Sequence, residues 1–202
     1  MTDLVTGADG RSRCAWSASA PDYAEYHDQE WGRPLYGDDE LFERLTLEAF
    51  QSGLSWLTIL RKRPAFRRAF DGFHIETVAR YGEADVARLL ADPGIVRNRA
   101  KVEAAIANAR AALELPDGLA ALLWSFAPPA RPSRPRTLAE VPALTPESTA
   151  LARTLKRRGF RFVGPTTAYA LMQATGMVDD HLAGCHVPVV TPTGIERPAG
   201  VA

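Results

Sequence analysis

The chain has 202 residues, of which 46% are hydrophobic and 24% are charged, a composition typical of soluble globular proteins. Basic and acidic side chains balance at 24 each, so the net charge does not by itself indicate a nucleic-acid partner. Because no apolar run is long enough to span a membrane and the first residues show no secretion signal, we expect a cytoplasmic protein.

Apolar residues recur at helical spacing along most of the chain, and sustained alternation is rare, so the sequence predicts an all-α fold. We expect residues 1–11 to be disordered, 12–189 to form a single domain, and 190–202 to be a flexible tail. The proline-rich stretch 126–136 is predicted to be a loop. The predicted helices cover 21–31, 38–51, 55–62, 64–70, 75–80, 83–91, 95–113, 118–124, 146–158 and 166–175.

Glu48 interrupts the apolar face of the helix predicted over 38–51. The spacing of Leu41, Leu45 and Glu48 puts the carboxylate in line with two leucines. A buried carboxylate is costly unless a positive or hydrogen-bonding group meets it. The position therefore predicts either a structural ion pair or a site for a cationic ligand.

The two helices predicted over 146–158 and 166–175 are joined by a glycine-bearing hairpin. Its glycines allow close backbone approach, and a helix start offers N–H groups to an anion such as a DNA phosphate. A plain helical hairpin is the alternative, but the flanking charge favours a DNA contact. The residues of this candidate DNA contact are Gly164, Lys156, Arg157, Arg158 and Arg161.

The two cysteines and three of the four histidines gather near the two ends of the chain. His181 and Cys185 are spaced so that one helical turn could aim both at a metal, and Cys14 with His27 would complete a Cys2His2 zinc set. Unrelated buried thiols and surface histidines are the alternative, and a disulfide is disfavoured in a reducing compartment. His186 is a rival ligand to His181. Four protein ligands leave no open position for water, so a catalytic zinc is not expected.

Aromatic residues crowd into a short stretch before Glu48. Such clusters usually belong to a core, but a tryptophan face beside a carboxylate also suits a flat cation. The clustered residues are Trp16, Tyr23, Tyr26, Trp31 and, just beyond Glu48, Trp56.

Several long segments of the chain resemble the bacterial DNA-3-methyladenine glycosylase I family, within the helix-hairpin-helix DNA glycosylases. The resemblance spans roughly residues 12–187 in consistent order. It implies two helical lobes around a cleft, with the N- and C-terminal segments joined by a structural zinc. The matching segments are 14–16, 23–32, 47–56, 94–101, 124–126, 156–164 and 180–185.

The resemblance also implies a function: flipping of 3-methyladenine out of alkylated double-stranded DNA and its excision, which leaves an abasic site. Glu48 and Tyr26 would hydrogen-bond the base, between aromatic walls, while Gly53 and Leu54 would probe the gap left by the flipped nucleotide. The walls would be Trp16, Tyr23, Trp31 and Trp56, and the zinc ligands Cys14, His27, His181 and Cys185.

N3-methylation makes the adenine cationic, so the leaving group needs no general acid. We expect an ionised Glu48 to bind the base, water to be the nucleophile, and no Schiff-base lyase activity, because no lysine is placed near the pocket. Asp179 is a departure from the family pattern. It could be a catalytic aspartate, although a helix cap or a hydrogen-bond partner of His181 is favoured.

Two other classes of function stay open from the residues alone. One is a zinc-stapled DNA-binding module without catalysis, and the other is a zinc hydrolase acting on small molecules. We expect a monomer, since no association motif is evident.

Overall fold

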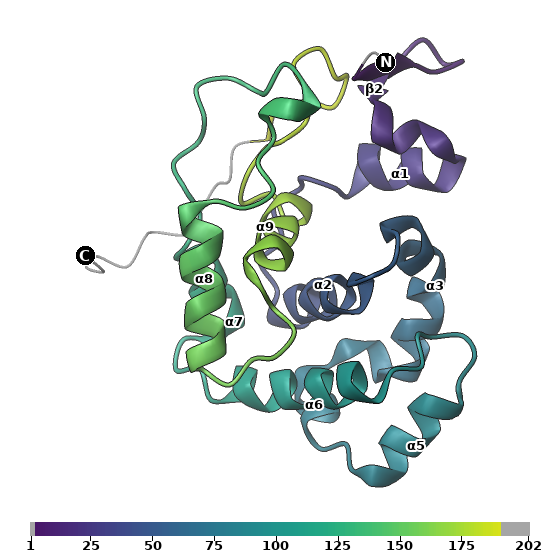
Figure 1. The fold of residues 1–202 in the computed structure, drawn as a ribbon, viewed down its shortest axis with the longest axis vertical. Coiled ribbons are helices and arrows are strands. Elements are labelled where there is room, and N and C mark those ends of the chain that lie inside the picture. Colours follow the sequence, from purple (N-terminus) through teal and green to yellow (C-terminus); the bar gives the residue numbers. More distant parts are fainter. Residues whose placement is uncertain (1–2, 191–202) are drawn as a thin grey trace.

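The computed structural model describes residues 3–190, and within them the fold is almost entirely helical (Figure 1). None of these helices combines the length and apolarity needed to cross a bilayer. The helices are α1 (Pro21–Gln29), α2 (Asp38–Gln51), α3 (Trp56–Ala69), α4 (Ile75–Ala79), α5 (Glu83–Ala91), α6 (Arg99–Leu113), α7 (Gly118–Trp124), α8 (Pro146–Arg157) and α9 (Pro165–Ala174), with short 3-10 turns η1 (Ala15–Ser19), η2 (Asp71–Phe73) and η3 (Leu138–Glu140).

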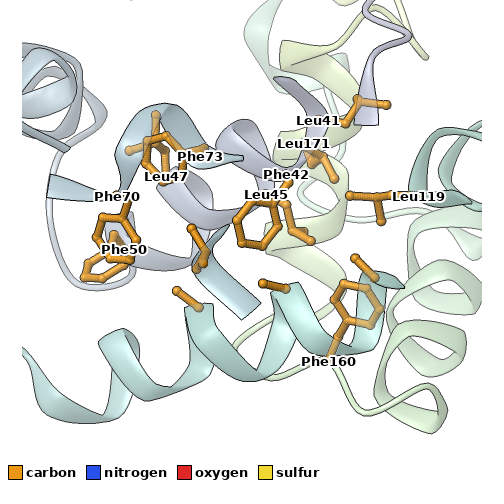
Figure 2. Packing of buried hydrophobic residues seen from close by; sticks show 14 of the residues in the cluster. Leu41, Phe42, Leu45, Leu47, Phe50, Phe70, Phe73, Leu119, Phe160 and Leu171 are labelled. Carbon is orange, nitrogen blue, oxygen red and sulfur yellow. The ribbon is translucent and has the colours of Figure 1, made fainter. Parts of the chain in front are cut away.

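Helix α2 runs through the middle of the molecule, with α3, α6 and α9 around it (Figure 1). Every residue from Leu41 to Phe50 is buried, as expected of a helix that is covered on all sides. Its side chains meet Phe70 and Phe73 at one end and Leu171 of α9 at the other (Figure 2). The polar side chains of Thr46 and Glu48 on the last turns of α2 are therefore held inside the protein.

Two helix boundaries differ from the sequence prediction for clear physical reasons. The helices predicted over 55–62 and 64–70 form one continuous helix, α3, although Pro64 lies inside it. Buried Ile59 and Phe66 pack on either side of the proline, so tertiary contacts hold both halves. Helix α6 begins at Arg99 and not at residue 95, because the Asn98 side chain caps it by accepting a hydrogen bond from the Lys101 N–H at 3.1 Å.

The prediction of disorder over 1–11 is wrong for the described part of that segment. Strand β1 (Leu4–Thr6) pairs antiparallel with β2 (Ser12–Cys14). The C-terminal segment lies against this hairpin, with the His186 N–H donating to the Ser12 carbonyl at 2.8 Å (Figure 1). The expected flexible tail falls outside the described residues from 191 onward, and the division into one domain over 12–189 stays a prediction.

The loop predicted over 126–136 is irregular as expected, and α8 and α9 form the predicted helical hairpin. Asn108 of α6 binds the backbone of this hairpin: its side chain accepts from the Arg161 N–H at 2.7 Å and donates to the Arg161 carbonyl at 3.1 Å. Gly159 has a φ of +91°, which allows the chain to leave α8 without strain.

Candidate active site

A cavity of about 240 Å³ opens where η1, α1, the end of α2, the start of α3 and α9 meet. The structure brings Glu48 and all five predicted aromatic residues into its wall, although they span forty positions of sequence. Their roles as base contacts stay a prediction. The lining residues are Trp16, Tyr23, Tyr26, Trp31, Glu48, Gln51, Trp56, Leu138, Val141, Ala170, Gln173 and Asp180.

The aromatic rings of the cavity contact one another and fix its shape. Trp16 meets Tyr23 and Trp31 edge-on, with ring centroids 4.9 and 5.0 Å apart. The Tyr26 and Trp56 rings lie 5.5 Å apart on another side. The Trp56 indole nitrogen is buried with no hydrogen-bond partner among residues 3–190. Aromatic faces and an unused donor suit a flat heterocycle that carries its own polar edge.

Glu48 is 6% exposed, and within the described chain no side chain or backbone group hydrogen-bonds its carboxyl group. Burial raises its pKa from 4.5 to about 8, and the nearby Arg44 only partly opposes this rise. At neutral pH the Glu48 carboxyl group of the ligand-free protein therefore favours its protonated form, and the ionised Glu48 expected with the cationic base bound stays a prediction. A cation in the cavity would favour the ionised form.

Near the two chain ends, Cys14, His27 and Cys185 form a buried group whose ligand atoms all lie within 4.8 Å of one another. The Cys185 sulfur is 3.6 Å from the His27 Nε2 atom. A hydrogen bond from Cys14 and a weaker contribution from His27 together lower the pKa of Cys185 to about 3. A thiolate beside a second thiol and an imidazole is a donor set that could hold a metal ion.

His181 lies next to this group, but its ring nitrogens do not come within 4.8 Å of all three ligand atoms. Its ring centroid is 4.9 Å from that of His27, and its Nε2 atom is buried with no partner among the described residues. Its Nδ1 atom is 3.0 Å from Asp179, as His27 Nδ1 is 2.8 Å from Asp28. Carboxylates thus orient both rings so that Nε2 is left for a metal, which is the usual arrangement around metal-bound histidines.

The backbone that carries His181 and Cys185 differs from the prediction. Residues 181–185 form a turn and not a helix, so the i, i+4 geometry expected for His181 and Cys185 is absent. The tertiary fold brings them to Cys14 instead, whose sulfur accepts from the Leu182 N–H at 3.4 Å. Asp179 accepts from the His181 N–H at 3.1 Å and does not line the cavity; of the two favoured roles, the structure has the partner of His181 and no helix for Asp179 to cap.

The sequence is similar to known proteins over most of its length. Residues 16–188 match the model of the family described as methyladenine glycosylase. The chain is 45% identical over 177 residues to DNA-3-methyladenine glycosylase 1 of Escherichia coli, covering 86% of this chain and 95% of that protein. It is 41% identical over 179 residues to the DNA-3-methyladenine glycosylase of Haemophilus influenzae, covering 86% and 96%.

This chain belongs to the methyladenine glycosylase family. The fold agrees: the structure of 3-methyladenine DNA glycosylase I from Staphylococcus aureus, reported for its recognition of 3-methyladenine, superimposes with a TM-score of 0.84 at 36% identity. The match covers 89% of this chain and 98% of that one. The all-α fold predicted from the sequence is confirmed.

The sequence did not point to three polar residues that line the cavity: Gln51, Gln173 and Asp180. Asp180 is buried, and its carboxylate accepts from Tyr169 at 2.6 Å, Gln173 at 2.8 Å and Arg131 at 2.6 Å. The spacing of Glu48 and Gln51 on one helix face could have indicated Gln51. Asp180 could not be told from Asp179 by spacing, because the chain is irregular there.

The residues expected to contact DNA lie in two places on this glycosylase fold. Gly53 and Leu54 form the turn after α2, with Gly53 at φ +83° and Leu54 42% exposed. In the α8–α9 hairpin, Lys156, Arg158 and Arg161 are exposed and Gly164 is the N-cap of α9. Pro165 removes one of the N–H groups expected at this helix start. Their contact with DNA stays a prediction.

The raised pKa of Glu48 predicts a pH-dependent stability. Between pH 4.5 and about 8 the unfolded chain has lost this proton and the folded chain keeps it, so the free energy of unfolding falls as pH rises. Glu48→Gln removes that titration. We expect its stability relative to wild type to increase from pH 5 to pH 9, by about 5 kcal/mol at the upper limit, from 1.36 kcal/mol per pKa unit.

Urea unfolding of both proteins at each pH measures this difference. Glu25→Gln, at an exposed glutamate of α1, controls for the loss of any one carboxylate. A difference between Glu48→Gln and wild type that does not change with pH would mean that Glu48 is already ionised in the ligand-free protein.

Proposed function

We propose that this chain repairs alkylated DNA by base excision: it flips 3-methyladenine from the duplex, binds the base in the cavity around Glu48, and hydrolyses the N-glycosidic bond to leave an abasic site. The observation that carries the proposal is a buried carboxyl group, with no hydrogen-bond partner in the described chain, in the wall of an aromatic cavity. Family membership supports the same reaction.

The chemistry of the substrate explains why the cavity needs few catalytic groups. N3-methylated adenine carries a positive charge while attached to the sugar, so it leaves without protonation. Glu48 would give up its proton when the cation enters, and would then accept hydrogen bonds from the base. Tyr26 would contribute a second polar contact, because burial raises the pKa of its hydroxyl and keeps it protonated. The tryptophan faces would add cation–π attraction.

Binding the cation tightly does not by itself accelerate the reaction, because the base loses its charge as the bond breaks. The cavity must therefore act chiefly by holding the flipped nucleotide where water can attack the sugar. The reaction would be monofunctional. The lysines of the chain are Lys62, Lys101 and Lys156, and none of them lines the cavity, so no amine is placed to form a Schiff base.

We further propose that the buried cysteine–histidine group holds one zinc ion, with His181 as the fourth ligand beside Cys14, His27 and Cys185. The unpartnered Nε2 atom of His181 and the thiol–imidazole donor set support this assignment. A closed set of four ligands would give zinc a structural role, tying the N-terminal hairpin to the C-terminal segment. It would also steady the cavity wall, since Trp31 contacts the His181 ring at 4.7 Å and Trp16 contacts His27 at 5.2 Å.

For DNA, we propose that Leu54 enters the gap left by the flipped nucleotide and that the α8–α9 hairpin binds the backbone. The double change Lys156→Gln with Arg158→Gln should weaken binding to duplexes of any sequence, and should lower the slope of log affinity against log salt by about one for each phosphate that the protein no longer neutralises. Arg80→Gln, an exposed arginine outside the hairpin, is the control. An unchanged salt slope in the double variant would exclude the hairpin.

Release of free base from methylated duplex DNA tests the function. We expect chromatography to detect 3-methyladenine, with abasic sites formed in equal number and without strand cleavage by the enzyme. A DNA-binding module would retain methylated DNA and release no base, so that outcome would overturn the proposal. Strand breaks that form together with base release would contradict the monofunctional assignment.

A further inference from the structure

We propose that Lys101 is a positioning residue that locks the end of α2, so that the base cavity and the DNA-probing turn are held as one rigid unit. The proposal rests on the function proposed above for Glu48 and Leu54. Lys101 touches neither the cavity nor the exposed leucine. It belongs to the segment 94–101, which resembles the family in sequence but takes no part in the reaction proposed above.

The contacts of Lys101 account for the carbonyl groups at the end of α2. Its ammonium group donates to the Phe50 carbonyl at 2.9 Å and to the Ser52 carbonyl at 2.7 Å. The carbonyl between them, that of Gln51, accepts from the Leu54 N–H at 2.6 Å. Three consecutive carbonyl groups thus accept hydrogen bonds, and two of these bonds come from Lys101 on another helix, α6. Helix ends usually leave such groups to water or to a glycine cap.

The positive charge of Lys101 strengthens its hydrogen bonds, but burying that charge costs free energy. Lys101 is only 8% exposed, and burial lowers its pKa. An ammonium group at a helix C-terminus is favoured by the helix dipole, and hydrogen bonds from a charged donor are about twice as strong as neutral ones. A cap for α2 alone would not require burying a charge. The stronger hydrogen bonds of a charged donor hold the turn against displacement.

The fixed segment carries functional residues on both sides. Glu48 and Gln51 line the cavity from the last turn of α2. Gly53 and Leu54 follow directly. Apart from the adjacent residues, no atom packs within 4 Å of the place a side chain at position 53 would take, so the tip of the turn has little packing of its own. A leucine that must enter a DNA stack from an unpacked tip depends on the anchoring of the turn behind it.

The segment 94–101 is built to hold the lysine in place. Ile95 is buried as an anchor, and Asn98 caps α6 through the Lys101 N–H. Lys62 fastens the start of the segment, donating to the Pro93 and Gly94 carbonyls at 3.1 and 3.2 Å. The backbone of Lys101 is therefore fixed before its side chain spans the gap to α2.

The test compares free-base binding with DNA repair in the full, metal-bound protein. For Lys101→Met we expect the dissociation constant for 3-methyladenine, followed by tryptophan fluorescence, to change less than about 3-fold. Single-turnover base release from methylated duplex DNA should fall about 10- to 100-fold, since a displacement of about 1 Å can cost that much. Arg110→Gln, which removes side-chain contacts to two other carbonyl groups, those of Ala79 and Tyr81 at 2.8 Å, should reduce base release by less than about 3-fold.

A double-mutant cycle with Leu54→Ala separates positioning from general stability. If Lys101 acts through the turn, adding Lys101→Met to Leu54→Ala should cost less than about a further 2-fold. Full multiplication of the two losses, or normal DNA repair by Lys101→Met, would overturn the proposal. Lys101→Gln, which keeps a donor, serves in the same cycle if the methionine variant unfolds. Absence of base release by wild type would instead refute the proposed function.

Discussion

Glu48→Gln should lower single-turnover excision of 3-methyladenine by about 10- to 100-fold and weaken binding of the free base. A hydrogen bond to a charged group in a buried site contributes about 1.5–3 kcal/mol, and the amide, which lacks this charge, would hold the flipped nucleotide less firmly where water can attack the sugar. The glutamine has nearly the same size, so the cavity keeps its shape. Base release under enzyme excess and fluorescence titration measure the two effects.

Glu43→Gln is the matched control for this change. Glu43 lies on the same helix and is 7% exposed, but its carboxylate accepts from Arg67 at 3.0 Å and does not reach the cavity. We expect it to alter stability and to leave excision within about 2-fold of wild type. Equal losses in the two variants would mean that Glu48 matters only for folding, and unchanged excision in Glu48→Gln would remove it from the base site.

His181→Gln should reduce tightly bound zinc from one ion per chain to almost none and lower the free energy of unfolding by several kcal/mol. Structural zinc binding contributes about 10–16 kcal/mol in small zinc-finger peptides, and this larger core would retain part of its stability. Because His181 and His27 contact Trp31 and Trp16, we expect base binding to weaken together with metal loss. Metal analysis after dialysis and thermal unfolding test this.

His186→Gln provides the comparison within the same cluster. His186 lies beside the group and contacts Asp28 at 2.9 Å, but it is not one of the four proposed ligands. It should retain one zinc ion per chain. Loss of zinc in His186→Gln with full retention in His181→Gln would reverse the ligand assignment, and retention in both would leave the four-ligand site without support.

The contacts of Arg44 explain why a nearby cluster of charges does not neutralise Glu48. Arg44 lies one turn before Glu48 on α2, yet its Nη2 atom binds Glu30 at 2.5 Å and no atom of its guanidinium group hydrogen-bonds Glu48; Glu30 also binds Arg63 at 2.6 Å. Arg44 stacks 5.8 Å from the Tyr26 ring centroid. The two arginines lower the pKa of Glu30 to about 2 despite its partial burial, so that the positive charge is used behind the cavity and not within it.

Local sequence was sufficient for the helices and for the candidate residues. Helical spacing, the Thr145–Pro146 start and the glycines at 159 and 176 placed α2, α5, α7, α8 and α9 within one residue, because these signals act over a single turn. Glu48 could be recognised because a charge on an apolar face is anomalous without knowledge of the partner helix. Cysteine and histidine are rare enough here that their placement indicated a metal group.

Tertiary packing decided the remaining features of the site, because burial and contacts between distant segments cannot be read from residues adjacent in sequence. The raised pKa of Glu48 follows from its burial among elements distant in sequence, and the turn at 181–185 joins the cysteine–histidine group through contact with the distant N-terminal hairpin. Asp180 faces the cavity while Asp179 turns to His181, a choice made by irregular backbone. The contact of Lys101 with α2 joins residues about fifty positions apart, beyond the reach of any periodic signal.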